Sequence, residues 1–269
     1  MTIPSVLERI SHSVAQRLEA RKKLCSELEL RTLAEKARVP FDFKKRITCQ
    51  TTNVIAEVKF ASPSQGALGP LDRQNLMSPR EVAESYLNNG AAALSVLTEQ
   101  DHFRGSLKYL AEIRHSQPDA ALLMKDIVLE DYQLLEGRVH GADAALLIVA
   151  LLGEKKTANL LSTCQSLGLT ALVEVHDQEE LRVAAGLGAD LIGVNNRNLK
   201  TLEISLETSF QLARVAPKGA TLVSESGLNH ASELNALKEV GFSTFLIGTS
   251  FMKTGQPGQA LAGLLLECS

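Results

Sequence analysis

The chain has 269 residues, of which 45% are hydrophobic and 22% charged, and its formal net charge is −3. This length suits one large α/β domain, and an acidic balance without tryptophan argues against nucleic-acid binding. The longest apolar stretch, Ala144 to Leu152, is far too short to span a membrane.

The termini and the cysteines predict an unexported protein. Residues 1–4 carry no positive region followed by an apolar core, so we expect a cytoplasmic location. The four cysteines are scattered without a Cys-x-x-Cys pair, which favours reduced thiols over disulfides or zinc ligands. No dedicated dimer motif is present, and we expect a monomer.

Residues 3–38 are predicted to form one helix. Val6, Ile10 and Val14 recur at helical spacing while charges fill the other face, and Pro40 ends the segment. Because this helix precedes the first strand, we interpret it as an N-terminal extension of the domain.

Eight apolar, strand-like runs come next, and amphipathic stretches long enough for a helix separate most of them. Such alternation predicts a parallel sheet surrounded by helices. The runs are residues 54–60, 92–98, 121–127, 143–149, 170–176, 191–196, 221–225 and 244–248.

A weak repeat indicates how the strands are arranged. Gly90, Gly141, Gly188 and Gly241 each end a helical pattern and open an apolar run, at intervals of 47 to 53 residues. Four such βαβα units give eight strands, which close a (β/α)8 barrel of the TIM-barrel type. The alternative is an open doubly wound sheet, which normally carries a Gly-x-Gly-x-x-Gly fingerprint that this chain lacks.

The predicted organisation is a single domain over residues 1–269. Residues 1–48 form the helical N-terminal extension and residues 49–269 form the barrel. Active sites of such barrels lie at the C-terminal ends of the strands, so polar residues there are candidates for chemistry.

Five of the runs carry ionisable or amide side chains near their C-terminal ends, at the same relative depth. Chance placement of polar residues at five strand ends is a poor explanation. We interpret the pattern as a shared cavity into which the strand ends point, and therefore as the active site of an enzyme. The residues are Glu57 with Lys59, Lys125, Glu174, Asn195 and Glu225. Glu57 and Lys59 share one strand face, and a purely structural ion pair is the weaker alternative because buried pairs stabilise poorly.

The small, turn-rich residues 61–66, which include Ser62, suit a mobile flap over that cavity. Lys125 and Glu174 lie on different strands and can act as an acid and a base if they are close. His176 shares a strand face with Glu174, but no second histidine occupies another strand end, so we interpret it as a loop-side residue with a local hydrogen bond and predict no metal site.

Small residues after the last two strands predict a phosphate site. Ser226 and Gly227 follow the seventh run, and Gly248 and Thr249 follow the eighth. Barrels of this class often bind phosphate there through backbone N–H groups. Ordinary helix N-caps are the alternative, since Ser and Thr are also preferred at N-caps.

Taken together, these segments resemble the indole-3-glycerol phosphate synthase family of the tryptophan pathway, in order from about residue 50 to residue 252. The similar segments are Ile-Ala-Glu-Val-Lys at 55–59, Ala-Ser-Pro-Ser at 61–64, Leu-Thr-Glu at 97–99, Phe-Arg-Gly-Ser at 103–106, Leu-Met-Lys-Asp at 123–126, Leu-Val-Glu-Val at 172–175, Gly-Val-Asn-Asn-Arg-Asn-Leu at 193–199, Ser-Glu-Ser-Gly at 224–227 and Leu-Ile-Gly at 246–248. A helical extension also suits this family.

The resemblance implies ring closure of 1-(2-carboxyphenylamino)-1-deoxyribulose 5-phosphate, with release of CO2 and water and without a metal or organic cofactor. Lys125 is then the general acid, Glu174 assists proton removal and dehydration, and Lys59 binds the anthranilate carboxylate and can donate a proton in the dehydration. Glu57 and Asn195 orient the sugar hydroxyls and the lysines.

The same resemblance implies contacts to the substrate, a small phosphorylated molecule. Arg197 supports the carboxylate side, Phe103 packs against the apolar part, and Ser62 and Glu225 also bind substrate. The expected phosphate ligands are Ser226, Gly227, Gly248 and Thr249.

Two positions depart from the common bacterial pattern of this family, and both remove positive charge from the first loop. Phe60 and Gln65 stand where basic residues are usual. Phe60 either weakens substrate binding or packs its ring against the N-terminal extension, and we favour packing.

Other functions remain alternatives at this point. Phosphoribosylanthranilate isomerase and the tryptophan synthase α subunit are also phosphate-binding barrels, but we do not expect them to combine Lys59, Lys125 and Glu174. A non-catalytic barrel retained as an interaction subunit would tolerate loss of the charged strand ends, and none is lost.

Overall fold

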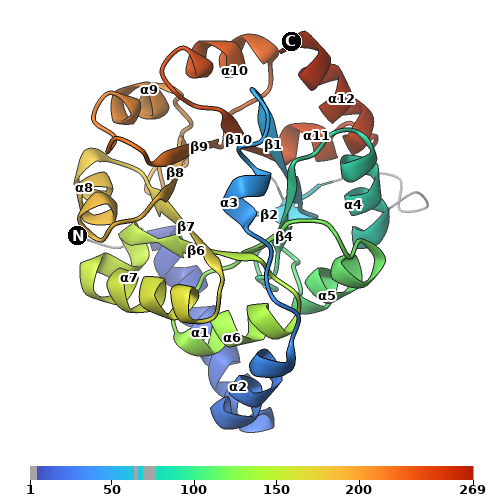
Figure 1. Ribbon diagram of the computed structural model, residues 1–269, viewed down its shortest axis with the longest axis vertical. Helices are drawn as coiled ribbons and strands as arrows, with labels where there is room; N and C mark the ends of the chain where they lie inside the picture. The colour runs from blue at the N-terminus through green and yellow to red at the C-terminus, as the bar shows by residue number, and fades with distance from the viewer. Residues whose placement is uncertain (1–4, 64–65, 69–76, 269) are drawn as a thin grey trace.

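Eight parallel strands form a closed barrel in the computed structural model, which describes residues 5–63, 66–68 and 77–268 (Figure 1). The first strand pairs with both the second and the last barrel strand, which closes the ring. The strands are β1 (Asn53–Val58), β4 (Ala93–Leu97), β5 (Leu122–Lys125), β6 (Ala144–Ile148), β7 (Thr170–Val175), β8 (Leu191–Asn195), β9 (Thr221–Glu225) and β10 (Thr244–Ile247). The predicted (β/α)8 barrel is confirmed, and every strand ends within two residues of its predicted range.

Helices surround the barrel because the strands are apolar on both faces. Those that follow the strands are α4 (Pro79–Asn88), α5 (Leu107–Ser116), α6 (Asp131–Val139), α7 (Val149–Ser166), α8 (Gln178–Gly186), α9 (Glu207–Ala213), α10 (Ala231–Lys238), α11 (Thr249–Met252) and α12 (Pro257–Glu267). The four repeated glycines adopt φ values between 75° and 102°, as the helix-end prediction requires. Within the described part of the chain, no helix has the length and apolarity needed to cross a bilayer.

The alternation of side chains along each strand separates two buried clusters. One lies between strands and helices, and the other fills the barrel interior with residues such as Ile55, Leu123 and Leu172. Each of these three lies two residues before Glu57, Lys125 or Glu174 and so shares its face. The polar side chains at the strand ends therefore continue the interior core upward into the barrel mouth.

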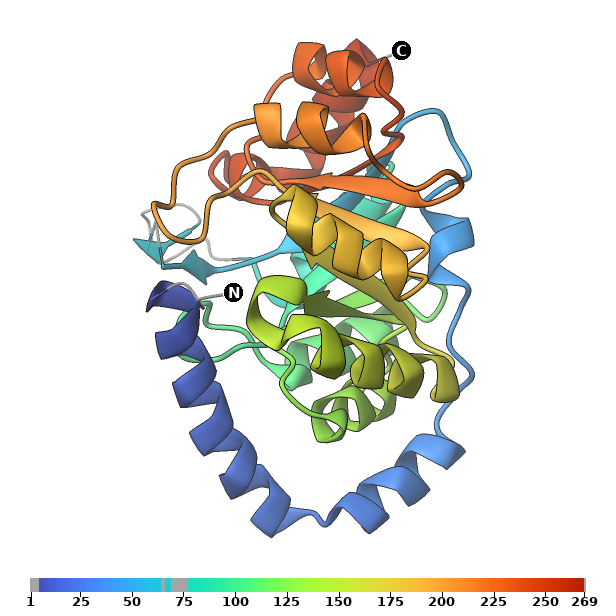
Figure 2. The ribbon, with the colours of Figure 1, turned by 90° about the vertical axis from the view of Figure 1, so that its left-hand side faces the viewer.

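The N-terminal segment forms two helices, not the single helix predicted over residues 3–38. α1 (Ser5–Leu24) ends before Ser26, which caps α2 (Glu27–Lys36). Ser26 and Glu29 form a capping box, in which the Ser26 N–H donates to Glu29 Oε2 over 2.8 Å. Figure 2 shows the resulting V, drawn in dark and lighter blue beside the barrel.

Ion pairs hold α1 along the outside of the barrel, with its first turns at the barrel mouth. Arg17 Nε donates to Asp101 Oδ2 over 2.6 Å after β4, and Arg21 Nε donates to Glu136 Oε1 over 2.7 Å on α6. A short third helix, α3 (Phe43–Arg46), returns the chain to the opposite end of the barrel, where Phe43 is fully buried in the interior cluster.

The segment after β1 forms a small antiparallel ribbon, β2 (Ala61–Ser62) with β3 (Gly66–Ala67). The departure at Gln65 lies outside the described residues. Phe60 packs edge-on against Tyr109 of α5, with ring centroids 5.8 Å apart and planes at 77°. The favoured packing role for Phe60 therefore has a different partner from the N-terminal extension that we expected.

Candidate active site

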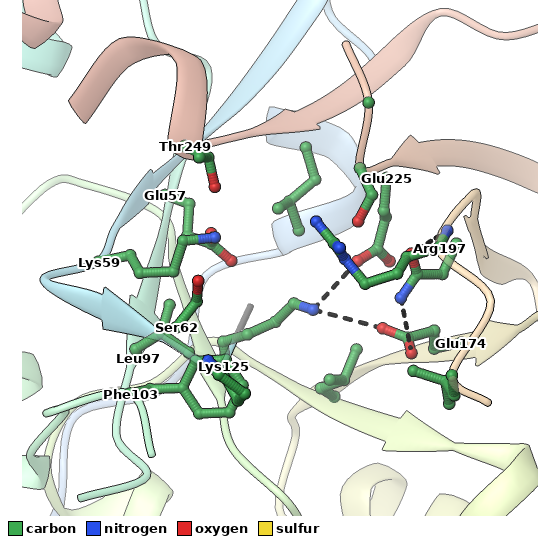
Figure 3. A pocket seen from close by; sticks show the side chains of 18 of the residues that line it. Glu57, Lys59, Ser62, Leu97, Phe103, Lys125, Glu174, Arg197, Glu225 and Thr249 are labelled. Atoms are coloured by element: carbon green, nitrogen blue, oxygen red, sulfur yellow. Dashed lines mark hydrogen bonds and ion pairs between the residues drawn. The ribbon is translucent and has the colours of Figure 1, made fainter. Parts of the chain in front are cut away.

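A pocket of about 310 Å³ opens where the barrel strands end (Figure 3). It brings together every residue that the sequence analysis assigned to catalysis or binding. Those lining it are Glu57, Lys59, Ser62, Phe103, Lys125, Glu174, Asn195, Arg197, Glu225, Ser226, Gly227, Gly248 and Thr249.

Lys125 lies at the centre of the pocket, between two carboxylates from the opposite side of the barrel. Its Nζ is 3.1 Å from Glu225 Oε2 and 3.3 Å from Glu174 Oε2, as the dashed lines in Figure 3 show. The side chains of both glutamates are at most 3% exposed. Because these groups are buried, a charge left without its partner would be costly here.

The surroundings shift the pKa values of these three groups in different directions. Burial alone would lower the pKa of Lys125, but Glu225, Glu174 and Glu57 together raise it above its ordinary value. Burial raises the pKa of Glu225, against the opposing effect of Lys125. The pKa of Glu174 is lowered because Lys125, His176 and Asn195 outweigh its burial. The pocket thus holds an ammonium, a carboxylate whose pKa is lowered and a carboxyl whose pKa is raised, a combination suited to acid–base chemistry.

Glu57 and Lys59 form an ion pair on the β1 side of the same pocket. The Lys59 side chain is 14% exposed, and Figure 3 shows it across the cavity from Glu174. Gly248 leaves room for Glu57, because a Cβ at that glycine would lie 2.6 Å from Glu57 Oε2. A pair that faces a cavity is available to a ligand, so a purely structural role is disfavoured.

Asn195 connects the β8 end to Glu174. Its Nδ2 donates to Glu174 Oε1 over 3.2 Å, and its Oδ1 accepts from the Arg197 N–H over 3.0 Å. The Arg197 guanidinium donates to the Leu202 carbonyl over 3.0 Å, which holds the loop after β8 beside the pocket. This amide therefore orients the Glu174 carboxylate and fixes the backbone at Arg197, while the Leu202 carbonyl holds the guanidinium.

The turns after β9 and β10 form the predicted small-residue end of the pocket. Ser226 and Gly227 adopt φ values of 67° and 80°, in the left-handed region. The helix N-cap alternative is wrong for Ser226 and Gly227, since His230 is the N-cap of α10. It holds for Gly248, which is the N-cap of α11 without a side-chain hydrogen bond. Lys253 also lines the pocket and was not predicted.

The apolar wall contributed by α1 was also missed. Val6, Leu7 and Ile10 line the pocket, and Leu7 and Ile10 belong to the interior cluster. Their helical spacing was evident, but periodicity shows only that a face is buried and not what it packs against.

His176 has more partners than the local hydrogen bond we expected. Its Nδ1 lies 3.0 Å from Glu180 Oε2, while its Nε2 lies 3.2 Å from Glu174 Oε1. In the described ranges, no group of three or more His, Cys, Asp or Glu side chains, the one around His176 included, is placed to hold a metal ion.

Solved structures share the barrel at low sequence identity. A 3-hexulose-6-phosphate synthase from Salmonella typhimurium is 12% identical, with a TM-score of 0.62 over 81% of this chain and 100% of that chain. A KGPDC from Streptococcus mutans is 13% identical, with a TM-score of 0.62 over 81% of this chain and 98% of that chain. At such identities the likeness shows the fold alone.

Sequence relatives are much more specific. Residues 7–264 match the family model described as indole-3-glycerol phosphate synthase. A protein of that name from Magnetococcus marinus is 41% identical over 264 residues, which cover 97% of each chain. Another from Laribacter hongkongensis is 40% identical over 264 residues, covering 96% of this chain and 98% of the relative. Together with the pocket at the barrel mouth, these matches show that the chain belongs to the indole-3-glycerol phosphate synthase family, carboxy-lyases of tryptophan biosynthesis.

Proposed function

We propose that this chain converts 1-(2-carboxyphenylamino)-1-deoxyribulose 5-phosphate to indole-3-glycerol phosphate, CO2 and water. The observation that carries the proposal is the ammonium of Lys125 between Glu174 and Glu225, inside a pocket that the small residues after β9 and β10 also line. Family membership over nearly the whole chain supports the same reaction.

Lys125 acts first, as the general acid. The aromatic carbon that bears the carboxylate attacks the ketone carbon of the sugar, and a C–C bond forms while the ketone oxygen gains a proton. The substrate nitrogen supplies the electron density for this attack, so we infer that no metal or organic cofactor takes part. A buried ammonium near the oxygen stabilises the developing charge most strongly in the transition state.

Glu174 acts in the later steps. Loss of CO2 returns an electron pair to the ring and restores its aromaticity. The new hydroxyl then leaves as water while a proton is removed from the neighbouring methylene carbon, which creates the indole double bond. We assign Glu174 as the base for that proton because it lines the pocket and its carboxylate is ionised at neutral pH.

The remaining pocket residues position the substrate. Lys59 binds the anthranilate carboxylate from the β1 side and can protonate the departing hydroxyl, and Arg197 supports the carboxylate. Glu57 and Asn195 orient the sugar hydroxyls. The other contacts that we assign come from residues lining the same pocket: Ser62, Phe103 and Glu225 to the substrate body, and Ser226, Gly227, Gly248 and Thr249 to the phosphate.

A turnover assay that follows indole fluorescence tests the proposal. The chain contains no tryptophan, so the product is detected without indole emission from the protein. Wild-type protein should turn over the substrate, and Lys125→Met, which keeps the side-chain volume, should lower kcat by at least about a hundredfold with KM within about tenfold. A near-normal kcat in the folded variant would remove Lys125 from the mechanism, and an inactive wild-type protein would overturn the function.

We further infer that the enzyme works as a cytoplasmic monomer without nucleic acid. The acidic net charge and the lack of a recognised dimer motif support this inference. Light scattering of the purified chain, with and without substrate, would test the monomer.

A further inference from the structure

His176 lies behind Glu174, outside the lining of the pocket, and contacts a carboxylate on each side. Nε2 is 3.2 Å from Glu174 Oε1, and Nδ1 is 3.0 Å from Glu180 Oε2. Glu180 is in the first turn of α8 and also accepts the His176 backbone N–H over 2.8 Å. Both glutamates are buried, and the His176 side chain is only 11% exposed.

This geometry fits a doubly protonated ring. Nδ1 makes a hydrogen bond to Glu180, and Nε2 is close enough to Glu174 Oε1 for an ion pair although it makes no hydrogen bond there. A neutral imidazole has one N–H, whereas both ring nitrogens of His176 face carboxylate oxygens, which only accept when ionised. Burial opposes the charge, but Glu174 and Glu180 outweigh it and raise the pKa of His176 to about 10. Those two carboxylates are the titratable groups that face the ring, while Lys125 reaches it only through Glu174.

The two carboxylate oxygens of Glu174 face different partners. Oε1 is occupied by the Asn195 amide and faces His176, whereas Oε2 is 3.3 Å from Lys125 Nζ at the pocket centre. We propose that His176 is a positioning residue that, as an imidazolium held by Glu180, keeps Glu174 ionised and directs its Oε2 toward the substrate. This role rests on the proposed function, in which Glu174 removes a proton.

Two substitutions separate charge from packing. His176→Gln keeps a hydrogen-bonding side chain but removes the positive charge, so the acidic limb of the kcat profile should move up by about one pH unit. Because Glu174 Oε2 is then less well directed toward the substrate, kcat at pH 7 should fall about tenfold with KM little changed. Glu180→Gln should leave the neutral-pH rate largely intact but introduce a loss of rate above about pH 8, because His176 then deprotonates within the assay range. His140→Gln is the matched control: that ring is half-buried against the Glu136 carbonyl and does not line the pocket.

Nitrogen NMR of the histidine rings gives a readout that does not depend on activity. The wild-type His176 ring should show two protonated nitrogens at pH 8, and Glu180→Gln should lower its titration midpoint. A neutral His176 ring at pH 8 in the wild-type protein overturns the inference, as does an unchanged pH profile in folded His176→Gln. If His176→Gln does not fold, the Glu180→Gln profile and the wild-type ring signals decide. Absence of wild-type turnover would overturn the proposed function instead, and the ring signals would still report the charge of His176.

Discussion

At the scale of single residues, the pocket concentrates charge where the barrel core ends. Lys125 offsets the nearby carboxylates, but Asp126 beside it has no cation in direct contact among its described partners. Its oxygens accept from Thr98 Oγ1 and, over 2.7 Å, from the Ile127 N–H. Burial is the main cause that raises the pKa of Asp126 to about 6. Such a residue makes folding sensitive to pH.

Asp126→Asn should therefore change how stability depends on pH. The folded wild-type chain retains the Asp126 proton to a higher pH than the unfolded chain, so this residue's contribution to stability falls as the pH rises from about 4 to about 6. The variant lacks that titration, and its free energy of unfolding should improve relative to wild type over this window. Urea titrations at several pH values measure the difference. Parallel curves for the two proteins would show that Asp126 ionises normally.

Phe60→Lys tests the packing of the first-loop aromatic residue. The edge-on contact with Tyr109 is lost, and we expect a lower melting temperature, equivalent to about 1 kcal/mol, with KM unmoved. Phe60→Leu is the control, since it keeps apolar contact without adding charge. A fall in KM at low salt, reversed by added salt, would show instead that the family's usual basic residue acts on the substrate here.

At the scale of elements, the turn after β9 has a left-handed backbone where we propose that the phosphate binds. Gly227 has a φ of 80°, and a Cβ there would collide with Ile204 of the preceding loop. Two lining loops of the pocket therefore meet at a position that tolerates no side chain.

Gly227→Ala should weaken substrate binding by about tenfold or more in KM, because both the turn and Ile204 must shift. Gly219→Ala is the matched control, with a φ of 89° but no atom within 4 Å of the added Cβ. The control should lose about 1 kcal/mol of stability without a change in KM. Inhibition by inorganic phosphate, measured on both variants, separates phosphate binding from general damage. Equal inhibition of Gly227→Ala and wild type would place the phosphate elsewhere.

The elements also show what the sequence could predict. The strand ranges were predicted to within two residues because apolar runs that alternate with helices are compatible with few structures other than a parallel sheet. The break between α1 and α2 was missed although Ser26 and Glu29 carry its signal, since the apolar periodicity continues on either side of it. The placement of His176 against Glu180 depends on how α8 starts, which side-chain periodicity does not report.

At the scale of the whole molecule, Asp143 joins the N-terminal extension to the end of the barrel opposite the pocket. The side chain is fully buried and accepts from Arg38, Arg114 and the Phe41 and Leu122 N–H groups, over 2.6 to 2.9 Å. One carboxylate thus binds segments that are far apart in the sequence.

Asp143→Ala should lower the free energy of unfolding by about 3–5 kcal/mol, because it leaves two partly buried guanidinium groups without a carboxylate and two backbone N–H groups without their acceptor. Asp190→Ala is the matched control from the same position of the glycine repeat. Its carboxylate pairs with Lys44 at the surface, with 69% exposure, and should contribute less than about 1 kcal/mol. Denaturant unfolding compares the two. Similar losses in both variants would contradict the difference in burial.

The pairing of β1 with β10, which closes the barrel, also determines when the pocket is completed during synthesis and folding. Residues 53–56 pair with residues 244–247, so the closing contact has one of the largest sequence separations in the molecule. Contacts of that kind form late in folding, after the local units between them. While synthesis has passed β9 but not β10, both neighbouring strands present open edges, and Glu57 has not yet met Gly248. A nascent chain that has not yet added β10 therefore lacks both the pairing that closes the barrel and the Gly248 side of the pocket.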